Sequence, residues 1–202
     1  MKPRLFVLHG YQAHVDSHWF HWLCQQFPDV ATHIVALPDA HHPQLSAWLS
    51  ALQAAIGQVD EQTFIVAHSL GCVTTLRFLS EQTEAAALGG LVLVAGFAEP
   101  LVNLPELNGF NREALHWSAV RKRSHNSLVV LSEDDVVVAP EATERLANAL
   151  YAPLLRLNHR GHFMRQNGCD TLPEVAQWLW QHLPQLTPAN GMMSHQKPLT
   201  NQ

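Results

Sequence analysis

The first residue that could do chemistry is a serine at a corner of the chain. In the stretch TFIVAHSLGCVTTL (residues 63–76), an apolar run ends at His68, Ser69 follows, and after Gly71 the apolar residues take helical spacing. A sharp turn from strand into helix lifts a serine hydroxyl clear of the backbone, and the N-terminus of the helix favours nearby negative charge. Ser69 is therefore a candidate nucleophile for acyl transfer through a covalent intermediate.

Small residues are needed two positions before and two positions after Ser69, because strand and helix approach each other closely there. Gly71 meets this requirement, and Ala67 adds only one methyl group where glycine is more usual. A chance match in an ordinary turn would explain these residues equally well. The partners of a serine nucleophile therefore have to be found elsewhere in the chain.

A catalytic serine needs a histidine as general base and an acid that orients it, and both should follow later strands. The run LVVLSEDDVVVAP places Asp134 and Asp135 just after an apolar stretch. Asp135 is the preferred acid, because DVVVAP resembles the D-P-x-V-P run that follows the acid in many hydrolases. Asp134 stays an alternative, because Ala139 stands where proline is more usual and could shift the acid loop by one residue.

The histidine is expected in the run LLRLNHRGHFM, which contains His159 and His162. His162 is preferred, because Gly161-His162-Phe163 resembles the Gly-His-aromatic sequence in which such domains often end. His159 lies nearer the preceding apolar run and could merely cap it. Serine, acid and histidine then follow one another in the order Ser69, Asp135, His162.

The oxyanion of a tetrahedral intermediate needs two preorganised N–H donors. One is expected from the backbone of Leu70, directly after Ser69. The second is expected from the loop LHGYQAHVDSHWFHWL, where the pair His9-Gly10 nominates the N–H of Tyr11. Gly10 could also be a plain turn glycine. The four pieces nevertheless agree in chain order and topological position, which argues against a chance match.

Six short apolar runs predict the strands that must position these residues. The runs are continuous rather than alternating, as expected for parallel strands covered on both faces. Helical stripes lie between them, so the sequence predicts a doubly wound α/β domain. The predicted strands are Leu5 to His9, His33 to Leu37, Phe64 to His68, Leu91 to Ala95, Leu128 to Leu131 and Leu154 to Leu157. The predicted helical stripes run from Leu45 to Ile56, from Ala142 to Leu150 and from Leu172 to Leu183.

Residues 1–184 are expected to form a single domain. Residues 185–202 lose periodicity and gain proline and polar residues, so they are expected to be a flexible C-terminal tail. The segment from Gly96 to Asn126 is the longest stretch without a predicted strand. It is expected to hold one helix over Glu113 to Val120 and to be too short for a separate lid domain.

Composition bounds the partners and the compartment. The chain has 202 residues, 47% of them hydrophobic, and a net charge of −5 with scattered basic residues, so nucleic acid is not an expected partner. No run of 18 apolar residues occurs and the apolar stretch at the start is too short for a signal peptide, so no membrane association is expected. The three cysteines, Cys24, Cys72 and Cys169, are widely spaced and are expected to be reduced, which favours a cytoplasmic location.

Fourteen histidines raise the question of a metal site. The tightest group is His14, His18 and His21 beside Asp16, but helical geometry is expected to begin only near His18. The apolar residues that follow, Trp19 among them, already claim the buried side. No metal and no cofactor are therefore expected. Metal-dependent hydrolysis by this loop is kept as an alternative.

With these residues in place, the chain resembles the small lid-less serine hydrolases of the α/β-hydrolase superfamily, the retinoblastoma-binding protein nine-like family. The resemblance covers about Arg4 to Leu183 and rests on HGYQAHVDSHWFHWL, AHSLGC, SEDDVVVAP and RGHF. It implies a three-layer α/β-hydrolase fold with a minimal six-stranded parallel sheet, in an order near 2-1-3-4-5-6 and without a lid domain. It also implies Ser69, Asp135 and His162 as the catalytic triad.

The expected function is hydrolysis of small carboxylic esters through an acyl-enzyme, with a small-molecule ester as substrate. An apolar pocket near Ser69 could be lined by Trp19, Phe97, Trp117 and Phe163, although side chains of these types more often belong to a core. The same machinery can hydrolyse amide or peptide bonds, so that alternative stays open. A non-catalytic protein-binding module on the same fold is the alternative from another functional class, although nothing in the sequence indicates a particular protein partner.

Overall fold

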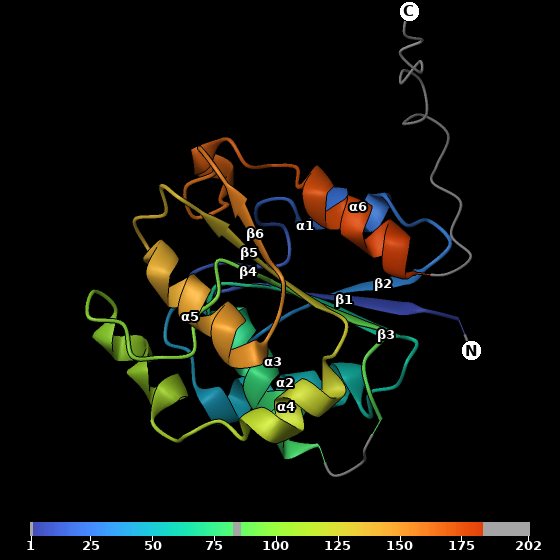
Figure 1. Cartoon of the computed structure of the whole chain (residues 1–202), viewed down its shortest axis with the longest axis horizontal. Coiled ribbons are helices and arrows are strands. Elements are labelled where there is room, and N and C mark those ends of the chain that lie inside the picture. Colours follow the sequence, from blue (N-terminus) through green and yellow to red (C-terminus); the bar gives the residue numbers. More distant parts are fainter. Residues whose placement is uncertain (1, 83–85, 184–202) are drawn as a thin grey trace, which may run out of the picture.

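The computed structural model describes residues 2–82 and 86–183. A six-stranded, wholly parallel sheet forms its centre, in the order β2-β1-β3-β4-β5-β6 that the sequence predicted (Figure 1). The strands are β1 (Arg4–Leu8), β2 (Ala31–Val35), β3 (Thr63–His68), β4 (Gly90–Val94), β5 (Ser127–Ser132) and β6 (Leu154–Leu157). Five of the six begin or end within one or two residues of the predicted bounds, and β6 has them unchanged.

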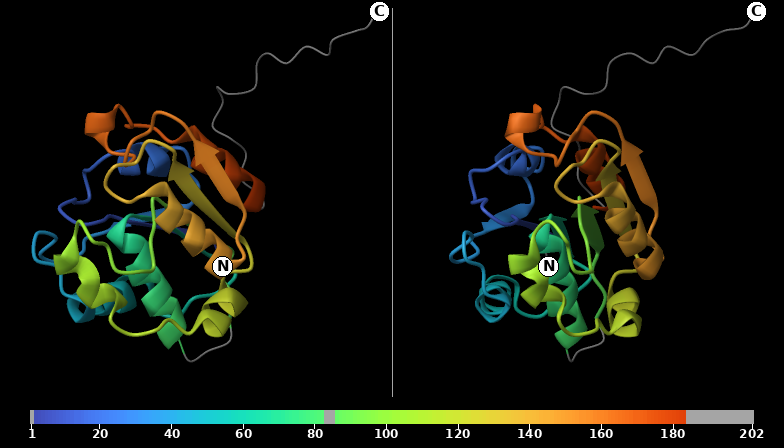
Figure 2. Two further views of the ribbon diagram at one scale, coloured as in Figure 1. Left: turned by 60° about the vertical axis from the view of Figure 1, so that its left-hand side comes forward. Right: turned by 90° about the vertical axis from the view of Figure 1, so that its left-hand side faces the viewer.

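Helices cover both faces of the sheet, which is why the central strands are apolar without alternation. Two lie on one face, α1 (Phe20–Gln25) and α6 (Pro173–His182), and a separate apolar cluster fills the space beneath them. Figures 1 and 2 show the remaining four on the opposite face. These are α2 (Leu45–Ile56), α3 (Leu70–Glu81), α4 (Trp117–Arg123) and α5 (Pro140–Leu150), over a second and larger apolar cluster.

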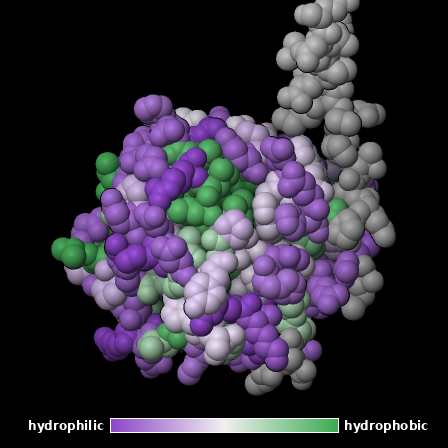
Figure 3. Space-filling view, in the orientation of Figure 1, coloured by the Kyte–Doolittle hydropathy of each residue, from purple (hydrophilic) through white to green (hydrophobic). Residues whose placement is uncertain are grey.

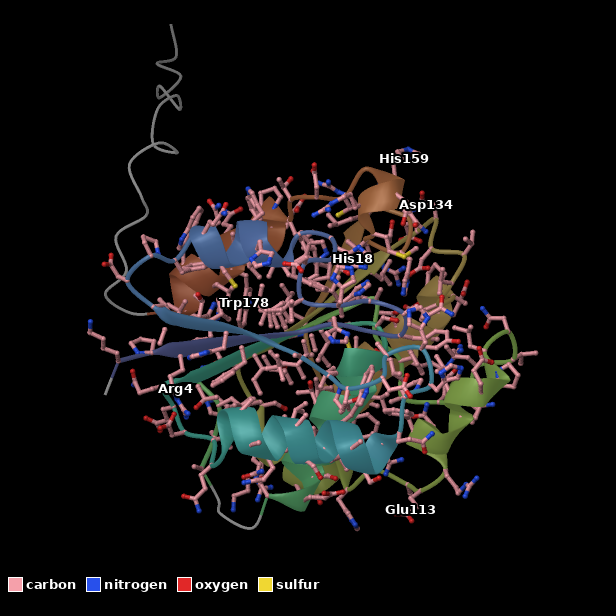
Figure 4. The ribbon with its side chains drawn as sticks, turned by 180° about the vertical axis from the view of Figure 1, so that it is seen from behind. Arg4, His18, Glu113, Asp134, His159 and Trp178 are labelled. Atoms are coloured by element: carbon pink, nitrogen blue, oxygen red, sulfur yellow. The ribbon has the colours of Figure 1, made fainter. Side chains whose placement is uncertain are left out.

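The loops that follow the strands gather at one end of the sheet, because all six strands run in the same direction. His18, Asp134 and His159 lie at this end, whereas Arg4 at the start of β1 lies at the other (Figure 4). The right-hand view of Figure 2 looks onto the same loops. In open α/β sheets this end is where ligands bind.

The segment between β4 and β5 differs from its prediction. The helix expected over Glu113 to Val120 is present as α4, but its predicted start was wrong, because α4 begins only at Trp117. A 3-10 helix, η1 (Pro105–Asn111), precedes it. The guanidinium of Arg77, on α3, donates to the carbonyls of Phe110, Glu113 and Ala114. Those carbonyls are then not free to start a helical ladder at Glu113. Within the described residues the segment forms no lid domain.

The surface toward the viewer in Figure 3 is mostly polar, with an apolar patch over β6 at the edge of the sheet, where Leu154, Leu155 and Leu157 are only partly buried. No helix in the described part of the chain is both long and apolar enough to cross a membrane. The predicted domain boundary at residue 184 and the predicted tail over 185–202 lie outside the described residues.

Candidate active site

Ser69 occupies the corner between β3 and α3 in a backbone conformation that non-glycine residues rarely adopt. Its φ is 53° and its ψ is −123°, a region that costs on the order of 1–3 kcal/mol and that usually persists where function needs it. The Ser69 N–H donates to the carbonyl of Val94 at 2.9 Å, which fixes the turn against the neighbouring strand. The strained turn therefore comes with a strand contact that holds it.

Two glycines allow the corner to pack closely. A Cβ on Gly71 would lie 2.6 Å from the carbonyl oxygen of His9, and a Cβ on Gly10 would lie 2.8 Å from the Cβ of Ser69. Both distances are too short for a side chain, so glycine is required at each position. Gly10 is thus not a plain turn glycine, because it places the loop after β1 directly against the serine.

His162 joins Ser69 to Asp135. Its Nε2 lies 2.9 Å from the Ser69 Oγ, and its Nδ1 lies 2.8 Å from the Asp135 Oδ2. All three residues are buried, with 4% of His162 and 6% of Asp135 exposed. An ionised carboxylate can only accept hydrogen bonds, so the His162 Nδ1 carries the hydrogen. Nε2 is then left to accept the hydrogen of the Ser69 hydroxyl. The structure brings together the three residues that the sequence nominated.

The Asp135 carboxylate is oriented by the chain that follows it. Its Oδ1 accepts the N–H of Val137 at 2.9 Å and the N–H of Val138 at 3.0 Å, which turns Oδ2 toward the histidine. An aspartate that accepts main-chain N–H groups two and three residues later forms a turn of its own. The register of the acid loop thus presents Asp135 rather than Asp134 to His162, in spite of the alanine at position 139.

Asp134 makes a different connection, which sequence reasoning missed. Its Oδ1 accepts the Ser132 hydroxyl at 2.6 Å and the N–H groups of Arg160 and Gly161, each at 3.2 Å. The Ser132 hydroxyl, and then these N–H groups, lower the pKa of the Asp134 carboxyl. Asp134 is therefore a tie between the loop after β5 and the loop after β6. The other candidate base, His159, is exposed and contacts neither Ser69 nor Asp135.

Leu70 and Tyr11, the residues expected to supply the oxyanion donors, lie in two segments that meet at Ser69. Leu70 is the first residue of α3, and the first N–H groups of a helix have no partner within it. The loop after β1, which carries Tyr11, lies beside this corner. The Tyr11 N–H makes no hydrogen bond to the part of the chain that the structure describes. Gly10 lies against the Ser69 Cβ, so the loop that carries Tyr11 passes beside the serine. The oxyanion role of these two N–H groups stays a prediction.

His9 fixes the direction of the Tyr11 N–H. Its Nε2 accepts the Leu37 N–H at 3.1 Å, so its Nδ1 carries the hydrogen and donates to the Gly10 carbonyl at 2.9 Å. Burial lowers the pKa of His9 and thus keeps this neutral form. In a trans peptide the C=O and the following N–H point in opposite directions. Holding the Gly10 carbonyl toward His9 therefore turns the Tyr11 N–H away from it.

The aromatic residues nominated as a substrate pocket lie deep in the structure. Trp19, Phe97 and Phe163 are almost wholly buried, and Trp117 is half-buried at the start of α4. Trp19 and Phe163 belong to the apolar cluster under α1 and α6, whereas Phe97 belongs to the cluster on the opposite face. Their part in substrate binding stays a prediction.

The histidine-rich loop does not gather its side chains around one point. His21 lies 2.8 Å from Asp16 on the surface, whereas His18 turns toward the buried histidines at positions 68 and 162. Among residues 2–82 and 86–183, no group of three or more His, Cys, Asp or Glu side chains could hold a metal ion. Burial, and then the charge of His162, lowers the pKa of His18 to about 4.

Known proteins resemble this chain over the part that contains the site. A family model described as Serine hydrolase matches residues 5–181, which include every element of the site. YdeN of Bacillus subtilis (strain 168), which is named as a hydrolase, is 34% identical over 177 residues, covering 87% of this chain and 93% of the relative. Serine hydrolase RBBP9 of Rattus norvegicus is 24% identical over 149 residues, covering 72% of this chain and 77% of the relative.

The fold is matched by solved structures. The crystal structure of the B. subtilis ydeN gene product superimposes with a TM-score of 0.87 and covers 90% of this chain and 98% of its own. Est1E from Butyrivibrio proteoclasticus is 16% identical and superimposes with a TM-score of 0.69, covering 90% of this chain and 88% of its own, which shows a shared fold.

Proposed function

The chain belongs to the serine hydrolase family and is a hydrolase, and we propose that it cleaves small carboxylic esters through an acyl-enzyme on Ser69. The observation that carries this proposal is the continuous path from the Ser69 Oγ through the His162 imidazole to the Asp135 carboxylate, with steps of 2.9 Å and 2.8 Å. Such a path lets a neutral hydroxyl become a nucleophile, because the imidazole of His162 can accept its proton.

In the first half of the reaction the Ser69 Oγ attacks the ester carbonyl carbon while His162 Nε2 takes the hydroxyl proton. Asp135 holds the imidazole in the required tautomer and stabilises the cation that forms. The N–H groups of Leu70 and Tyr11 would bind the oxyanion. Collapse of the intermediate breaks the bond to the alcohol, which leaves with the proton from His162.

In the second half a water molecule replaces the alcohol. His162 takes a proton from the water as its oxygen attacks the acyl carbon, and the collapse of the second intermediate returns that proton to the Ser69 Oγ. The carboxylic acid is released and the enzyme is restored. Each proton that His162 accepts is given back, so the cycle consumes only ester and water.

The segment between β4 and β5 favours a small substrate. It supplies only η1 and α4, which cannot enclose a long acyl chain. Amide or peptide hydrolysis would use the same residues and is the alternative reaction. A protein-binding module without activity is the alternative from another class.

A set of p-nitrophenyl esters, assayed on wild type and on Ser69→Ala, tests the proposal. Hydrolysis by wild type and its loss in Ser69→Ala are expected, and a chelator should leave the rate unchanged. Activity that survives in Ser69→Ala but is lost with chelator would overturn the mechanism in favour of a metal-dependent one. A well-folded wild type that cleaves neither esters nor p-nitroanilides would favour the binding module.

We also propose that the protein works in the cytoplasm on a small-molecule ester. The three cysteines support this location, since all are free thiols and Cys72 and Cys169 are buried. Cell fractionation with an antibody against the native protein would test it. Recovery of the protein in the membrane or the secreted fraction would contradict it.

A further inference from the structure

His68, the residue before the serine, has a side chain that the reaction described above does not use. Only 2% of the residue is exposed. Four rings surround its imidazole, with centroid distances from 4.9 to 6.2 Å, and they belong to His18, Trp19, Phe20 and His162. An imidazole in such a place is costly to bury unless its nitrogen atoms form hydrogen bonds there.

One nitrogen does. The Nε2 of His68 lies 2.8 Å from the main-chain carbonyl oxygen of His162. A carbonyl can only accept, so Nε2 must carry the hydrogen, and Nδ1 then has only a lone pair. Nδ1 is buried and has no partner in the described part of the chain. Burial, and then the charge of His162, lowers the pKa of His68 well below its ordinary value, so the ring stays neutral.

The loop that this bond holds is a strained one. His159, Gly161 and Phe163 all have positive φ, at 57°, 50° and 55°. A second ring donor lies beside the first, because the Trp19 Nε1 donates to the carbonyl of Phe163 at 3.1 Å. Two consecutive carbonyls at the catalytic histidine are thus held by ring N–H groups from other parts of the chain. Strained backbone persists only where such contacts fix it.

We propose that His68 is a positioning residue that holds the main chain of His162 so that its imidazole meets Ser69. The proposal rests on the proposed function of Ser69 and His162. Because His68 and Ser69 are neighbours in the chain, one dipeptide carries both the nucleophile and the donor that fixes its base. The spacing between serine and histidine is therefore set by a contact that does not pass through the reacting atoms.

The matched pair His68→Gln and His68→Met tests the donor itself. Both replacements are unbranched and similar in length, but only glutamine has a terminal N–H that can reach the His162 carbonyl. Burying the extra amide oxygen of glutamine costs free energy, so the methionine variant should be no less stable. Val92→Ala is the control for a loss of packing, because Val92 lies in the same apolar cluster and pairs with Val66 and Leu128 on the neighbouring strands.

We expect His68→Met to lower kcat roughly 10- to 100-fold with little change in KM, since small misplacements of a catalytic group cost this much. His68→Gln should stay within about threefold of wild type, as should Val92→Ala. The rate at which a fluorophosphonate labels Ser69 should fall in parallel with kcat. Wild-type kcat in His68→Met, or an equal loss in both His68 variants, would overturn the proposal.

A measurement without turnover separates this proposal from the proposed function. The proton shared by His162 and Asp135 should give a downfield NMR signal in wild type and in His68→Gln, and should lose it in His68→Met. The same signal in all three proteins would overturn the positioning role, whatever their activity. Failure of the proposed function looks different, because wild type would then hydrolyse no ester although its signal and its response to His68→Met remain.

Discussion

The Nδ1 of His162 lies 2.8 Å from a carboxylate oxygen of Asp135, although Asp134 stands next to it in the same turn. The two aspartates make different contacts. Asp135 is buried and binds the imidazole, whereas Asp134 is exposed and binds the main chain of the loop in which the histidine lies. Their neighbouring positions thus serve one purpose, since one orients the ring and the other its loop.

Replacing each of the two aspartates by asparagine should separate these roles. Asp135→Asn is expected to lower kcat by several orders of magnitude, about 10⁴-fold by analogy with a protease triad, because the amide favours the wrong imidazole tautomer. Asp134→Asn should lower kcat much less. Steady-state kinetics on one ester will compare them, with Asp29→Asn, an exposed aspartate between α1 and β2, as the control. A larger loss in Asp134→Asn than in Asp135→Asn would contradict the assignment.

Gly10 offers a test of the oxyanion loop. Gly10→Ala would place a Cβ 2.8 Å from that of Ser69 and push the Tyr11 N–H out of place. A loss of about 10²- to 10³-fold in kcat is expected, as for the removal of one oxyanion donor. Gly109→Ala is the matched control, because a Cβ there meets nothing within 4 Å. Near-normal kcat in Gly10→Ala would show that this loop does not serve the oxyanion.

Stability should fall in mild acid because of buried histidines. The pKa values of His9, His18 and His68 are lowered in the folded protein, that of His18 to about 4. Below about pH 6.5 the unfolded chain therefore binds more protons than the folded one. The free energy of unfolding then decreases as the pH is lowered. Each such histidine adds at most roughly 1.4 kcal/mol per pH unit to this slope. Above about pH 7.5 all three are almost entirely neutral in both states, so their contribution to the slope vanishes.

Urea unfolding at several pH values between about 7.5 and 5 measures this slope. His68→Gln should make it shallower than in wild type, because one of the three groups is gone. His41→Gln, which removes an exposed histidine, should leave it unchanged. Equal slopes in wild type and His68→Gln would mean that His68 takes up a proton in the folded protein, against the neutral form described above.

Chain length of the ester tests the shape of the site. Acetate and butyrate esters of p-nitrophenol should be good substrates, and kcat/KM should drop sharply for long acyl chains. Each buried methylene adds roughly 0.8 kcal/mol of binding, but only while there is protein to bury it, and the short segment between β4 and β5 offers little. A rising preference through octanoate and beyond would contradict an open site.

Much of this architecture could be predicted from the sequence, because strong local patterns and the global fold agree. Continuous apolar runs gave the strands, and parallel strands bring the residues after them to one end of the sheet. Ser69, Asp135 and His162 could be nominated because each follows a strand at a characteristic place. The bounds of strands moved by a residue or two, since hydrogen bonding between neighbours decides where a strand begins.

The sequence could not supply what depends on contacts between distant segments. The helix expected at Glu113 starts later because Arg77, 36 residues away, takes its carbonyl. The roles of Asp134 and His68 likewise depend on main-chain groups of the loop after β6, and no local pattern marks such partners. The sequence does place His68 at the end of an apolar run, directly before the serine, which indicates a buried imidazole that needs a partner but does not say which one.

The central claim is that Ser69 is an activated nucleophile, and labelling with a fluorophosphonate tests it most directly. The folded wild type should gain one phosphonyl group, and mass spectrometry of its peptides should locate that group on Ser69. Denatured wild type, Ser69→Ala and His162→Ala should stay unlabelled under the same conditions, because an isolated serine hydroxyl is a poor nucleophile. Folded wild type that remains unlabelled, or label on a residue other than Ser69, would contradict the account.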